Sequence, residues 1–154
     1  MRGGTQTDRS LLLRHEPELR AVRSKLMTGV QRFIASLPPA DPAHPLLGRP
    51  RGDLRIAGSW SVRLGPGGFN VAHTHPLGWI SSAFYVALPD GGVGGALRLG
   101  APPPELGLDL SPYAEIEPEP GRLLLFPSTM WHETTPIEGG ERLNIAFDIV
   151  PANG

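Results

Sequence analysis

Two closely spaced histidines are the first residues of this sequence that suggest chemistry. His73 and His75 lie one residue apart in "NVAHTHPLGW". If this stretch is a strand, residues i and i+2 point to the same face, so the two imidazoles can share one metal ion. Such pairs also occur on strands that bind no metal. The pair alone therefore leaves both interpretations open.

A third histidine favours the metal interpretation. His132 lies in "PSTMWHETTP", directly after the apolar stretch "GRLLLFP". Two ligands from one strand and a third from a distant strand can form one face of an octahedron. The opposite positions then stay open for substrate, cosubstrate and oxygen. Imidazole nitrogen suits iron, zinc, copper and nickel, so the ligand set alone does not select the metal.

An arginine opens the last alternating stretch, "ERLNIAFDIV". One face of such a strand would line the interior of a barrel: Arg142, Asn144, Ala146 and Asp148. The other face is apolar and suits contact with a helix: Leu143, Ile145, Phe147 and Ile149. A buried guanidinium needs an anion, because an unpaired buried charge is costly.

Two kinds of anion can meet this need. One is a structural partner, such as Asp148 or Glu133. The other is the carboxylate of a bound small molecule, which a guanidinium can grip at two points. From Arg142 alone we would favour the salt bridge. Beside three histidines, we favour the bound carboxylate.

The composition is that of one globular domain. The chain has 154 residues, a formal net charge of −1 and no cysteine. This length supports a single core, and the charge gives no attraction to nucleic acid or membrane. The lack of cysteine excludes disulfides, thiolate ligands and cysteine nucleophiles. No segment has the length of a signal-peptide core or a membrane span, so we expect a cytoplasmic protein.

The pattern along the chain predicts one helix followed by strands. Residues 17–37 repeat apolar side chains at three- and four-residue steps, which indicates an amphipathic helix that packs on a sheet. From residue 54 onward, short apolar stretches alternate with turns, including "GPGG" at 65–68. This is typical of a sandwich or barrel. The predicted strands are 54–64, 69–75, 79–88, 96–100, 114–118, 121–127, 129–136 and 141–150.

We divide the chain into two parts within a single compact domain. Residues 1–53 hold the helix and an irregular linker, and are expected to pack on the barrel. Residues 54–154 are expected to form the barrel itself.

In their order, the motifs resemble those of Fe(II)- and 2-oxoglutarate-dependent dioxygenases. The order is the HxH pair, the stretch "FYVALP", the stretch "GRLLLFPSTMWH", and Arg142 ten residues after His132. The resemblance is closest to a bacterial branch with the signature "HxHP…YYV…P…G…L.FP…H…R…AF". It covers about residues 54–151. It implies a mainly β fold, a double-stranded β-helix or cupin-like jelly-roll, with helices backing the larger sheet.

The resemblance also implies roles for particular residues. His73 matches the first metal histidine, His75 the position usually held by a carboxylate, and His132 the distal histidine. Arg142 matches the arginine that binds the far carboxylate of 2-oxoglutarate. Two further positions are expected to contact this cosubstrate: Asn144 and Tyr85. The implied cofactors are Fe(II), 2-oxoglutarate and O2.

The HxH pair departs from the HxD or HxE that most of these enzymes carry. Two imidazoles and a carboxylate leave Fe(II) with one positive charge, whereas three neutral imidazoles leave it with two. An alternative alignment makes His75 the first ligand, places Leu77 at the carboxylate position and leaves His73 outside the ligand set. We favour three histidines, because His75 already occupies the i+2 position that the geometry requires.

The resemblance implies an oxygenase that hydroxylates a C–H bond while 2-oxoglutarate is decarboxylated to succinate. One alternative is a cupin-like three-histidine metalloprotein that does not use 2-oxoglutarate. Another is a non-catalytic jelly-roll binding module. Loops 88–95 and 101–113 are expected to select the substrate, which is a small molecule or a protein side chain. Three aromatic residues are candidates to line the cavity: Trp79, Phe84 and Trp131. The sequence carries no signal for an oligomeric state.

Overall fold

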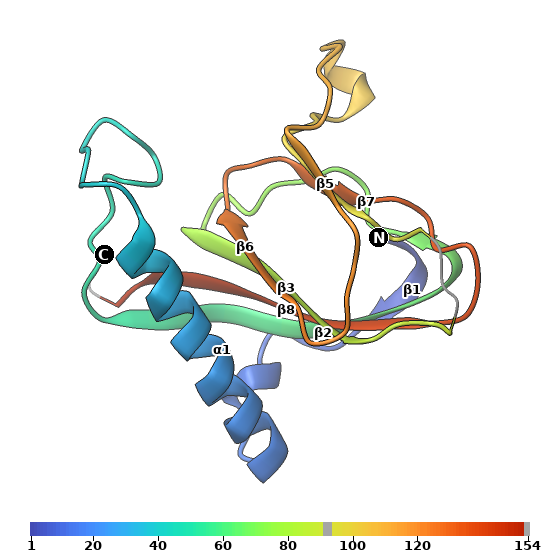
Figure 1. Cartoon of the computed structure of the whole chain (residues 1–154), viewed down its shortest axis with the longest axis horizontal. Helices are drawn as coiled ribbons and strands as arrows, with labels where there is room; N and C mark the ends of the chain where they lie inside the picture. Colours follow the sequence, from blue (N-terminus) through green and yellow to red (C-terminus); the bar gives the residue numbers. More distant parts are fainter. Residues whose placement is uncertain (91–93, 153–154) are drawn as a thin grey trace.

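Two antiparallel β-sheets and one long helix make up the structure, a computed structural model that describes residues 1–90 and 94–152 (Figure 1). The larger sheet has the order β1-β2-β8-β3-β6: Arg2–Gln6, Leu54–Phe69, Arg142–Pro151, Ile80–Ala87 and Leu123–Pro127. The smaller sheet has the order β5-β4-β7: Ala114–Ile116, Leu97–Leu99 and His132–Thr134. The predicted jelly-roll, mainly β with an N-terminal helix, is confirmed.

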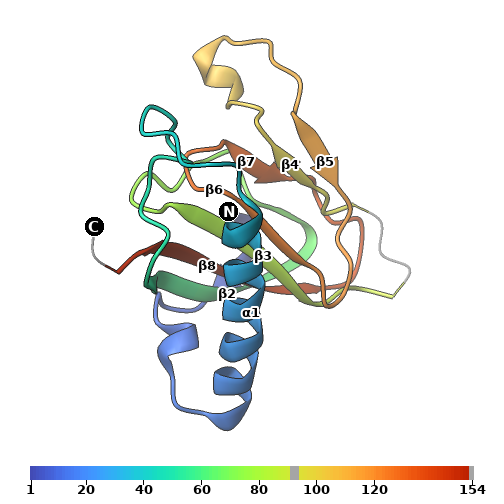
Figure 2. The same cartoon turned by 60° about the vertical axis from the view of Figure 1, so that its left-hand side comes forward.

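Helix α1 (Pro17–Ser36) crosses the outer face of the larger sheet, as both views show (Figures 1 and 2). Pro17 occupies the first turn, where its missing N–H is tolerated and its fixed φ suits the helix. The buried stripe of α1 shares one core with the apolar faces of β3 and β8: Leu26, Val30, Ile34, Ile80, Ile145, Phe147 and Ile149. Burying each such side chain contributes about 1.5–3 kcal/mol, which holds α1 against the sheet.

Strand β8 lies in the middle of the larger sheet and separates two environments. Ile145, Phe147 and Ile149 pack in the core beneath α1, as predicted. Its alternate residues Arg142, Asn144 and Ala146 line a cavity on the other side. The alternation read from the sequence therefore describes both faces of this strand correctly.

A bulge at Ala57 changes which face of β2 its side chains occupy. The pairing of β2 with β8 shifts by one residue between Ile56 and Gly58. Before the shift, Ile56 packs in the core beneath α1, and after it Trp60 lines the cavity. Without the extra residue, Ile56 and Trp60 would share a face, because side chains alternate with a period of two. The bulge thus turns the second half of β2 toward the interior.

Residues 65–68, predicted to be a turn, lie inside β2 instead. Arg2 pairs with Phe69 and Gly4 with Leu64, so Gly3 alone stands opposite these four residues. "GPGG" therefore forms an irregular bulge of four residues within β2, and the chain does not reverse there. Strand β1, which it faces, was not predicted, because "RGGTQ" has no alternation of apolar and polar residues.

The predicted strand 69–75 is also wrong. Beyond β2 this segment forms only an isolated bridge between His73 and His132. A regular antiparallel ladder would next place Met130 opposite His75. The N–H of His75 instead donates to the carbonyl of Ser128, at 2.8 Å. This slip of two residues leaves the segment irregular.

The segment 101–113 projects from the smaller sheet, away from the rest of the molecule, in both views (Figures 1 and 2). It carries several large apolar side chains that are more than half exposed: Leu106, Leu108, Leu110 and Tyr113. The other predicted mouth loop, 88–95, includes residues 91–93, which lie outside the described residues. Within the part of the chain that the structure describes, no helix is long and apolar enough to span a membrane.

Candidate metal centre

Two histidines of one segment, His73 and His75, meet the distant His132 between the two sheets. One ring nitrogen of each lies within 4.8 Å of those of the other two. The ring centroids are 4.2 Å apart for His73 and His132, 5.0 Å for His75 and His132, and 5.1 Å for His73 and His75. The backbones of His73 and His132 also bond reciprocally, at 3.1 and 3.0 Å. The side chains thus meet as expected, although the strand that was to align them is absent.

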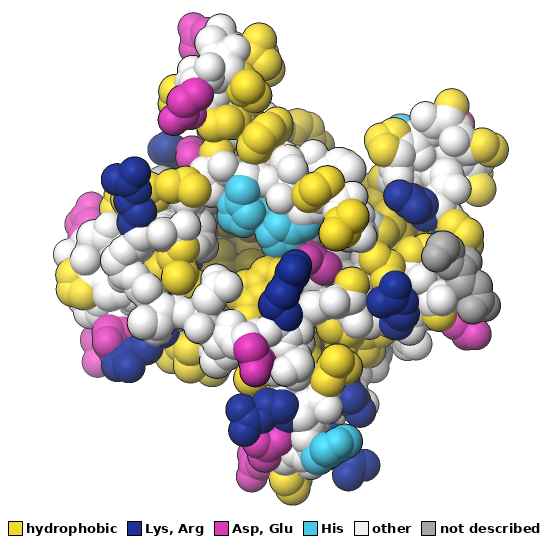
Figure 3. Space-filling view, turned by 180° about the vertical axis from the view of Figure 1, so that it is seen from behind, with side chains coloured by type: hydrophobic (Ala, Val, Ile, Leu, Met, Phe, Trp, Pro, Cys, Tyr) yellow, Lys and Arg dark blue, Asp and Glu magenta, His cyan; other side chains and the backbone are white. Residues whose placement is uncertain are grey.

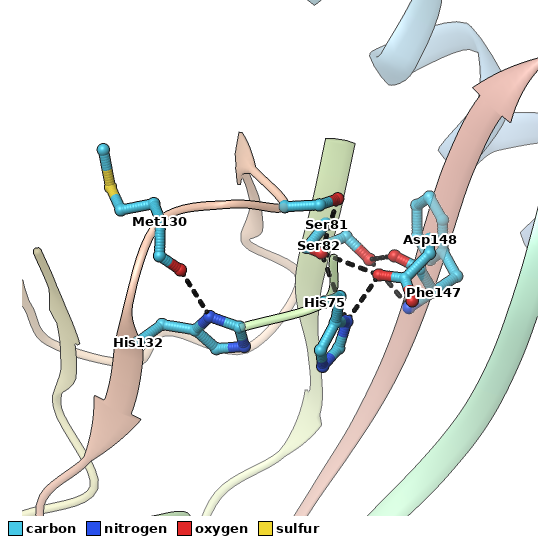
Figure 4. Close-up of polar contacts among 8 residues, drawn as sticks. His75, Ser81, Ser82, Met130, His132, Phe147 and Asp148 are labelled. Atoms are coloured by element: carbon cyan, nitrogen blue, oxygen red, sulfur yellow. Dashed lines mark hydrogen bonds and ion pairs between the residues drawn. The ribbon is translucent and has the colours of Figure 1, made fainter. Parts of the chain in front are cut away.

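In all three imidazole rings, Nδ1 is the nitrogen that bonds to another group of the protein. Nδ1 of His73 lies 2.7 Å, and Nδ1 of His132 3.0 Å, from the carbonyl oxygen two residues earlier in the chain. A carbonyl only accepts, so these Nδ1 atoms carry hydrogens and the Nε2 lone pairs are free for a metal. Nδ1 of His75 lies 2.7 Å from a carboxylate oxygen of Asp148, with the same consequence (Figure 4).

The carboxylate behind His75 is buried and held from a second direction. Asp148 is 5% exposed and also accepts a hydrogen bond from Oγ of Ser81, at 2.7 Å. Oγ of Ser128 lies 2.9 Å from Oγ of Ser81. Because the Ser81 hydrogen points to Asp148, the Ser128 hydroxyl is the donor in that pair. These bonds fix the carboxylate and, through it, the ring of His75 (Figure 4).

The histidines line a cavity of about 540 Å³ between the sheets. In Figure 3, histidine side chains gather at a hollow in the face opposite that of Figure 1. Trp60 lies beside His75, with ring centroids 5.6 Å apart. Other lining residues are Gln6, Arg9, Val62, Asn70, Val71, Ala83, Leu97, Phe126, Glu133 and Thr134.

The aromatic residues predicted to line this cavity do not do so. Trp79 and Phe84 pack in the core beneath α1, because they face the other side of the larger sheet. Trp131 is not among the lining residues that the structure describes. Trp60, which does line the cavity, was missed because the bulge that turns it inward leaves no mark on the apolar pattern.

Three buried polar side chains of the cavity each have one atom without a partner. Arg142 is 2% exposed, Tyr85 1% and Asn144 5%. The unpartnered atoms are Nε of Arg142, the hydroxyl of Tyr85 and Oδ1 of Asn144. A buried polar group without a partner costs about 1–3 kcal/mol, so three in one cavity indicate a missing polar ligand.

The guanidinium of Arg142 has no carboxylate partner within the described residues. Its Nη1 donates to the carbonyl oxygen of Gly95, at 2.7 Å. The structural salt bridge that the sequence left possible, to Asp148 or Glu133, is not formed. Asp148 pairs with His75 instead, and Glu133 comes only within 3.9 Å of a different arginine. The positive charge of Arg142 is therefore available to an anion in the cavity.

Burial sets the protonation of these groups. It lowers the pKa of His132 to about 4 and also lowers the pKa of His73, so both rings are neutral near pH 7 and can bind a metal. Burial likewise raises the pKa of Tyr85, although the charge of Arg142 acts against it, so the hydroxyl keeps its hydrogen. Burial lowers the pKa of Arg142, but arginine remains charged in proteins.

These residues fit a divalent metal and an anionic ligand. Three imidazoles with free Nε2 atoms are donors that Fe(II), Ni(II), Zn(II) and Cu(II) accept. The buried guanidinium and the tyrosine hydroxyl are donors that suit a carboxylate. All six residues proposed from the sequence line this one cavity: His73, His75, Tyr85, His132, Arg142 and Asn144. The sequence did not reveal that Asp148 bonds to His75.

Residues 58–148 match a family model described as "Putative 2OG-Fe(II) oxygenase". That match covers more than half of the chain and includes every one of the six residues. A comparison with curated protein sequences gives no match.

Several solved structures have a similar fold. A 2OG-Fe(II) oxygenase family oxidoreductase from Burkholderia pseudomallei is 15% identical, with a TM-score of 0.59 over 87% of this chain and 56% of its own. A viral collagen prolyl hydroxylase from Paramecium bursaria Chlorella virus-1, in its 2OG complex, is 18% identical, with a TM-score of 0.59 over 98% and 81%. HygX from Streptomyces hygroscopicus, with nickel and 2-oxoglutarate bound, is 14% identical, with a TM-score of 0.60 over 98% and 71%. This chain thus spans little more than half the length of the first of these proteins.

Proposed function

The chain belongs to this family of 2OG-Fe(II) oxygenases, and from that premise we propose that it is a hydroxylase dependent on Fe(II), 2-oxoglutarate and O2. It would hydroxylate a C–H bond of its substrate while 2-oxoglutarate is converted to succinate and CO2. One observation carries the proposal. Three free imidazole nitrogens and an uncompensated guanidinium share one cavity. A small molecule with a metal-chelating end and a distant carboxylate satisfies both at once.

His73, His75 and His132 would hold the metal through their Nε2 atoms, because each Nδ1 is already bonded. When bound, Fe(II) supplies the redox chemistry that activates O2 for attack on a C–H bond. Three protein ligands on one side leave coordination positions for small molecules on the other. The protein supplies orientation and an environment with few competing ligands.

Arg142 would pair with the far carboxylate of 2-oxoglutarate. The guanidinium of Arg142 lies over the ring of Tyr85, with 5.7 Å between the guanidinium carbon and the ring centroid, and this supports the role. Tyr85 would donate a hydrogen bond from its neutral hydroxyl to the same carboxylate. Asn144 pairs with Tyr85 across β3 and β8, so its amide lies in the same row. Together these groups would fix the end of the cosubstrate that does not react.

The substrate is a small molecule or a protein side chain in this proposal. Structurally similar proteins include a viral collagen prolyl hydroxylase and a prolyl hydroxylase from Trichoplax adhaerens in complex with a peptide fragment, but their identity to this chain is below 20%. The lining of the cavity also includes a basic residue, Arg9, and an acidic residue, Glu133, that could contact a charged substrate. We also propose a cytoplasmic location, with no nucleic acid or membrane as partner, from the composition of the chain.

Succinate formation tests the proposal. Purified protein would be loaded with Fe(II) under anaerobic conditions, mixed with 2-oxoglutarate and exposed to O2. The expected result is succinate that depends on all three components, at a slow rate without substrate. An Arg142→Met variant should lose this turnover, whereas Arg98→Met should keep it, because Arg98 pairs with Glu115 outside the cavity. Metal binding without any succinate would contradict the use of 2-oxoglutarate.

A second candidate is a three-histidine metalloprotein that does not use 2-oxoglutarate. The absence of a carboxylate from the histidine cluster, within the described residues, favours it. In that case Arg142 would bind the anionic group of the substrate itself. The two candidates differ in one measurable property, since only the first predicts that 2-oxoglutarate and the metal strengthen each other's binding.

A further inference from the structure

We propose that Asp148 is a positioning residue for the metal, and that it supplies through His75 the negative charge that the three-histidine ligand set lacks. This inference rests on the proposed function. It adds that a carboxylate takes part in the site from behind the imidazole of His75, and is not itself one of the ligands. The chain then needs both members of the pair, His75 as the ligand and Asp148 as its charged support.

The hydrogen bonds of the three rings are unequal, and this carries the inference. Nδ1 of His73 and Nδ1 of His132 face neutral backbone carbonyls. Nδ1 of His75 alone faces a carboxylate, at 2.7 Å. A carboxylate that accepts from Nδ1–H makes Nε2 of the same ring a stronger donor to a metal.

Burial and charge make this pair more than a surface contact. Asp148 is 5% exposed, and within the described residues no lysine or arginine pairs with it. A buried carboxylate without a cation is costly. A divalent metal on the far side of His75 would supply the compensating positive charge. The carboxylate therefore favours occupancy of the cluster by a cation.

The surroundings hold Asp148 in the orientation that this role needs. Ser81 lies directly opposite Asp148 in the pairing of β3 and β8 and donates to the same oxygen as His75. Ser128 donates in turn to Ser81 and is fully buried. Gly78 leaves room for Ser128, because a Cβ at Gly78 would lie 2.5 Å from its Oγ. Residues from three segments thus fix one carboxylate oxygen.

Asp148→Asn tests the role of the charge. The amide keeps the size of the side chain and an oxygen that accepts from His75, but it removes the negative charge. Co(II) would be titrated into the metal-free protein, with the dissociation constant taken from calorimetry and the geometry from the visible spectrum of bound Co(II). We expect the affinity of Asp148→Asn to fall about 10- to 100-fold, with a changed spectrum. Asp53→Asn, outside the cavity, is the matched control and should bind as the wild type does.

A double-mutant cycle separates positioning from general stability. If Asp148 acts through His75, then Asp148→Asn should have little effect on Co(II) affinity once His75→Ala has removed the ring. An equal loss in both backgrounds would mean that Asp148 acts through the fold, and would overturn the inference. Should Asp148→Asn not fold, Ser81→Ala, which removes only one of the bonds to the carboxylate, serves instead. We expect it to weaken Co(II) binding several-fold.

The outcomes also separate this inference from the proposed function. If the wild type binds no Co(II), both are contradicted. If the wild type binds Co(II) and Asp148→Asn binds it equally well, only the role of Asp148 is contradicted. If Asp148→Asn weakens binding and 2-oxoglutarate has no effect on either protein, the role of Asp148 stands while the use of 2-oxoglutarate does not.

Discussion

Arg142 lies with its guanidinium carbon 5.7 Å from the ring centroid of Tyr85, and each of these buried side chains keeps one polar atom without a partner. Both atoms belong to one cavity, which they share with the three histidines. The fold leaves hydrogen-bonding capacity of both side chains unused, so the pair can bind a polar ligand.

Replacing the guanidinium should weaken binding of the anion but not of the metal. We expect Arg142→Met to weaken the affinity for 2-oxoglutarate at least about 30-fold, which corresponds to about 2 kcal/mol. Co(II) affinity should stay the same, because Arg142 bonds to none of the histidines. Calorimetry of both ligands checks this. A variant with unchanged 2-oxoglutarate affinity would remove Arg142 from the proposed site.

The same variant should leave the ligand-free fold as stable as before, or more so. A buried guanidinium without a carboxylate partner lowers the free energy of unfolding. An apolar side chain of similar length removes this cost. Urea unfolding of the metal-free proteins checks this expectation. A loss of several kcal/mol would mean that Arg142 is a structural residue, stabilised by contacts such as its bond to Gly95.

Two glycines allow a matched test of how Arg142 is positioned. Gly95 has φ of +78°, and a Cβ there would lie 3.0 Å from Nη1 of Arg142. Gly107 has φ of +66°, and a Cβ there would meet nothing within 4 Å. Alanine at either position should cost stability, about 1–2 kcal/mol, from the left-handed backbone. Only Gly95→Ala should also weaken 2-oxoglutarate binding. Equal effects of both on ligand affinity would argue against a role for the Arg142 geometry.

Acid should destabilise the metal-free protein through His132. Its pKa is lowered to about 4, whereas an unfolded histidine has a pKa of about 6.5, so between these values the unfolded chain binds more protons. Stability from this residue is present above pH 6.5 and is lost as the pH falls toward 4. At pH 5 the loss is about 2 kcal/mol relative to pH 7.

The check is urea unfolding at pH 7 and pH 5, in the presence of a chelator, for the wild type and His132→Gln. The wild type should lose about 2 kcal/mol more than the variant. A bound metal should reduce the dependence, because it competes with the proton for the same ring. Equal losses in both proteins would show that His132 titrates normally.

The sequence predicted which residues line this cavity better than it predicted the strands and loops that hold them. The alternation in β8 placed Arg142 and Asn144 inside correctly, because one strand with a buried face repeats strictly every two residues. The same reasoning failed for His73 and His75, whose segment is not a strand. They still converge, since a backbone bridge holds His73 beside His132 and a carboxylate orients His75.

Other features depend on contacts between distant segments and left no local signal. The bulge at Ala57 turns Trp60 into the cavity, yet the sequence around it predicts only one or two strands and does not locate a bulge. Strand β1 lies at the edge of the sheet, with all of its residues exposed, so it has no apolar periodicity. The bond between Asp148 and His75 joins residues 73 positions apart. Asp148 is in β8 and His75 in the irregular segment before β3, so only the folded chain brings them together.

Thermodynamic coupling between metal and cosubstrate tests the central claim most directly. The affinity for 2-oxoglutarate would be measured by calorimetry on the wild type with and without bound Co(II), and on His75→Ala, with His15→Ala as a control of an exposed histidine. We predict that Co(II) tightens 2-oxoglutarate binding at least about tenfold in the wild type and the control, and that 2-oxoglutarate tightens Co(II) binding by the same factor. His75→Ala should lose most of this coupling. Equal affinity for 2-oxoglutarate with and without the metal would contradict a shared site.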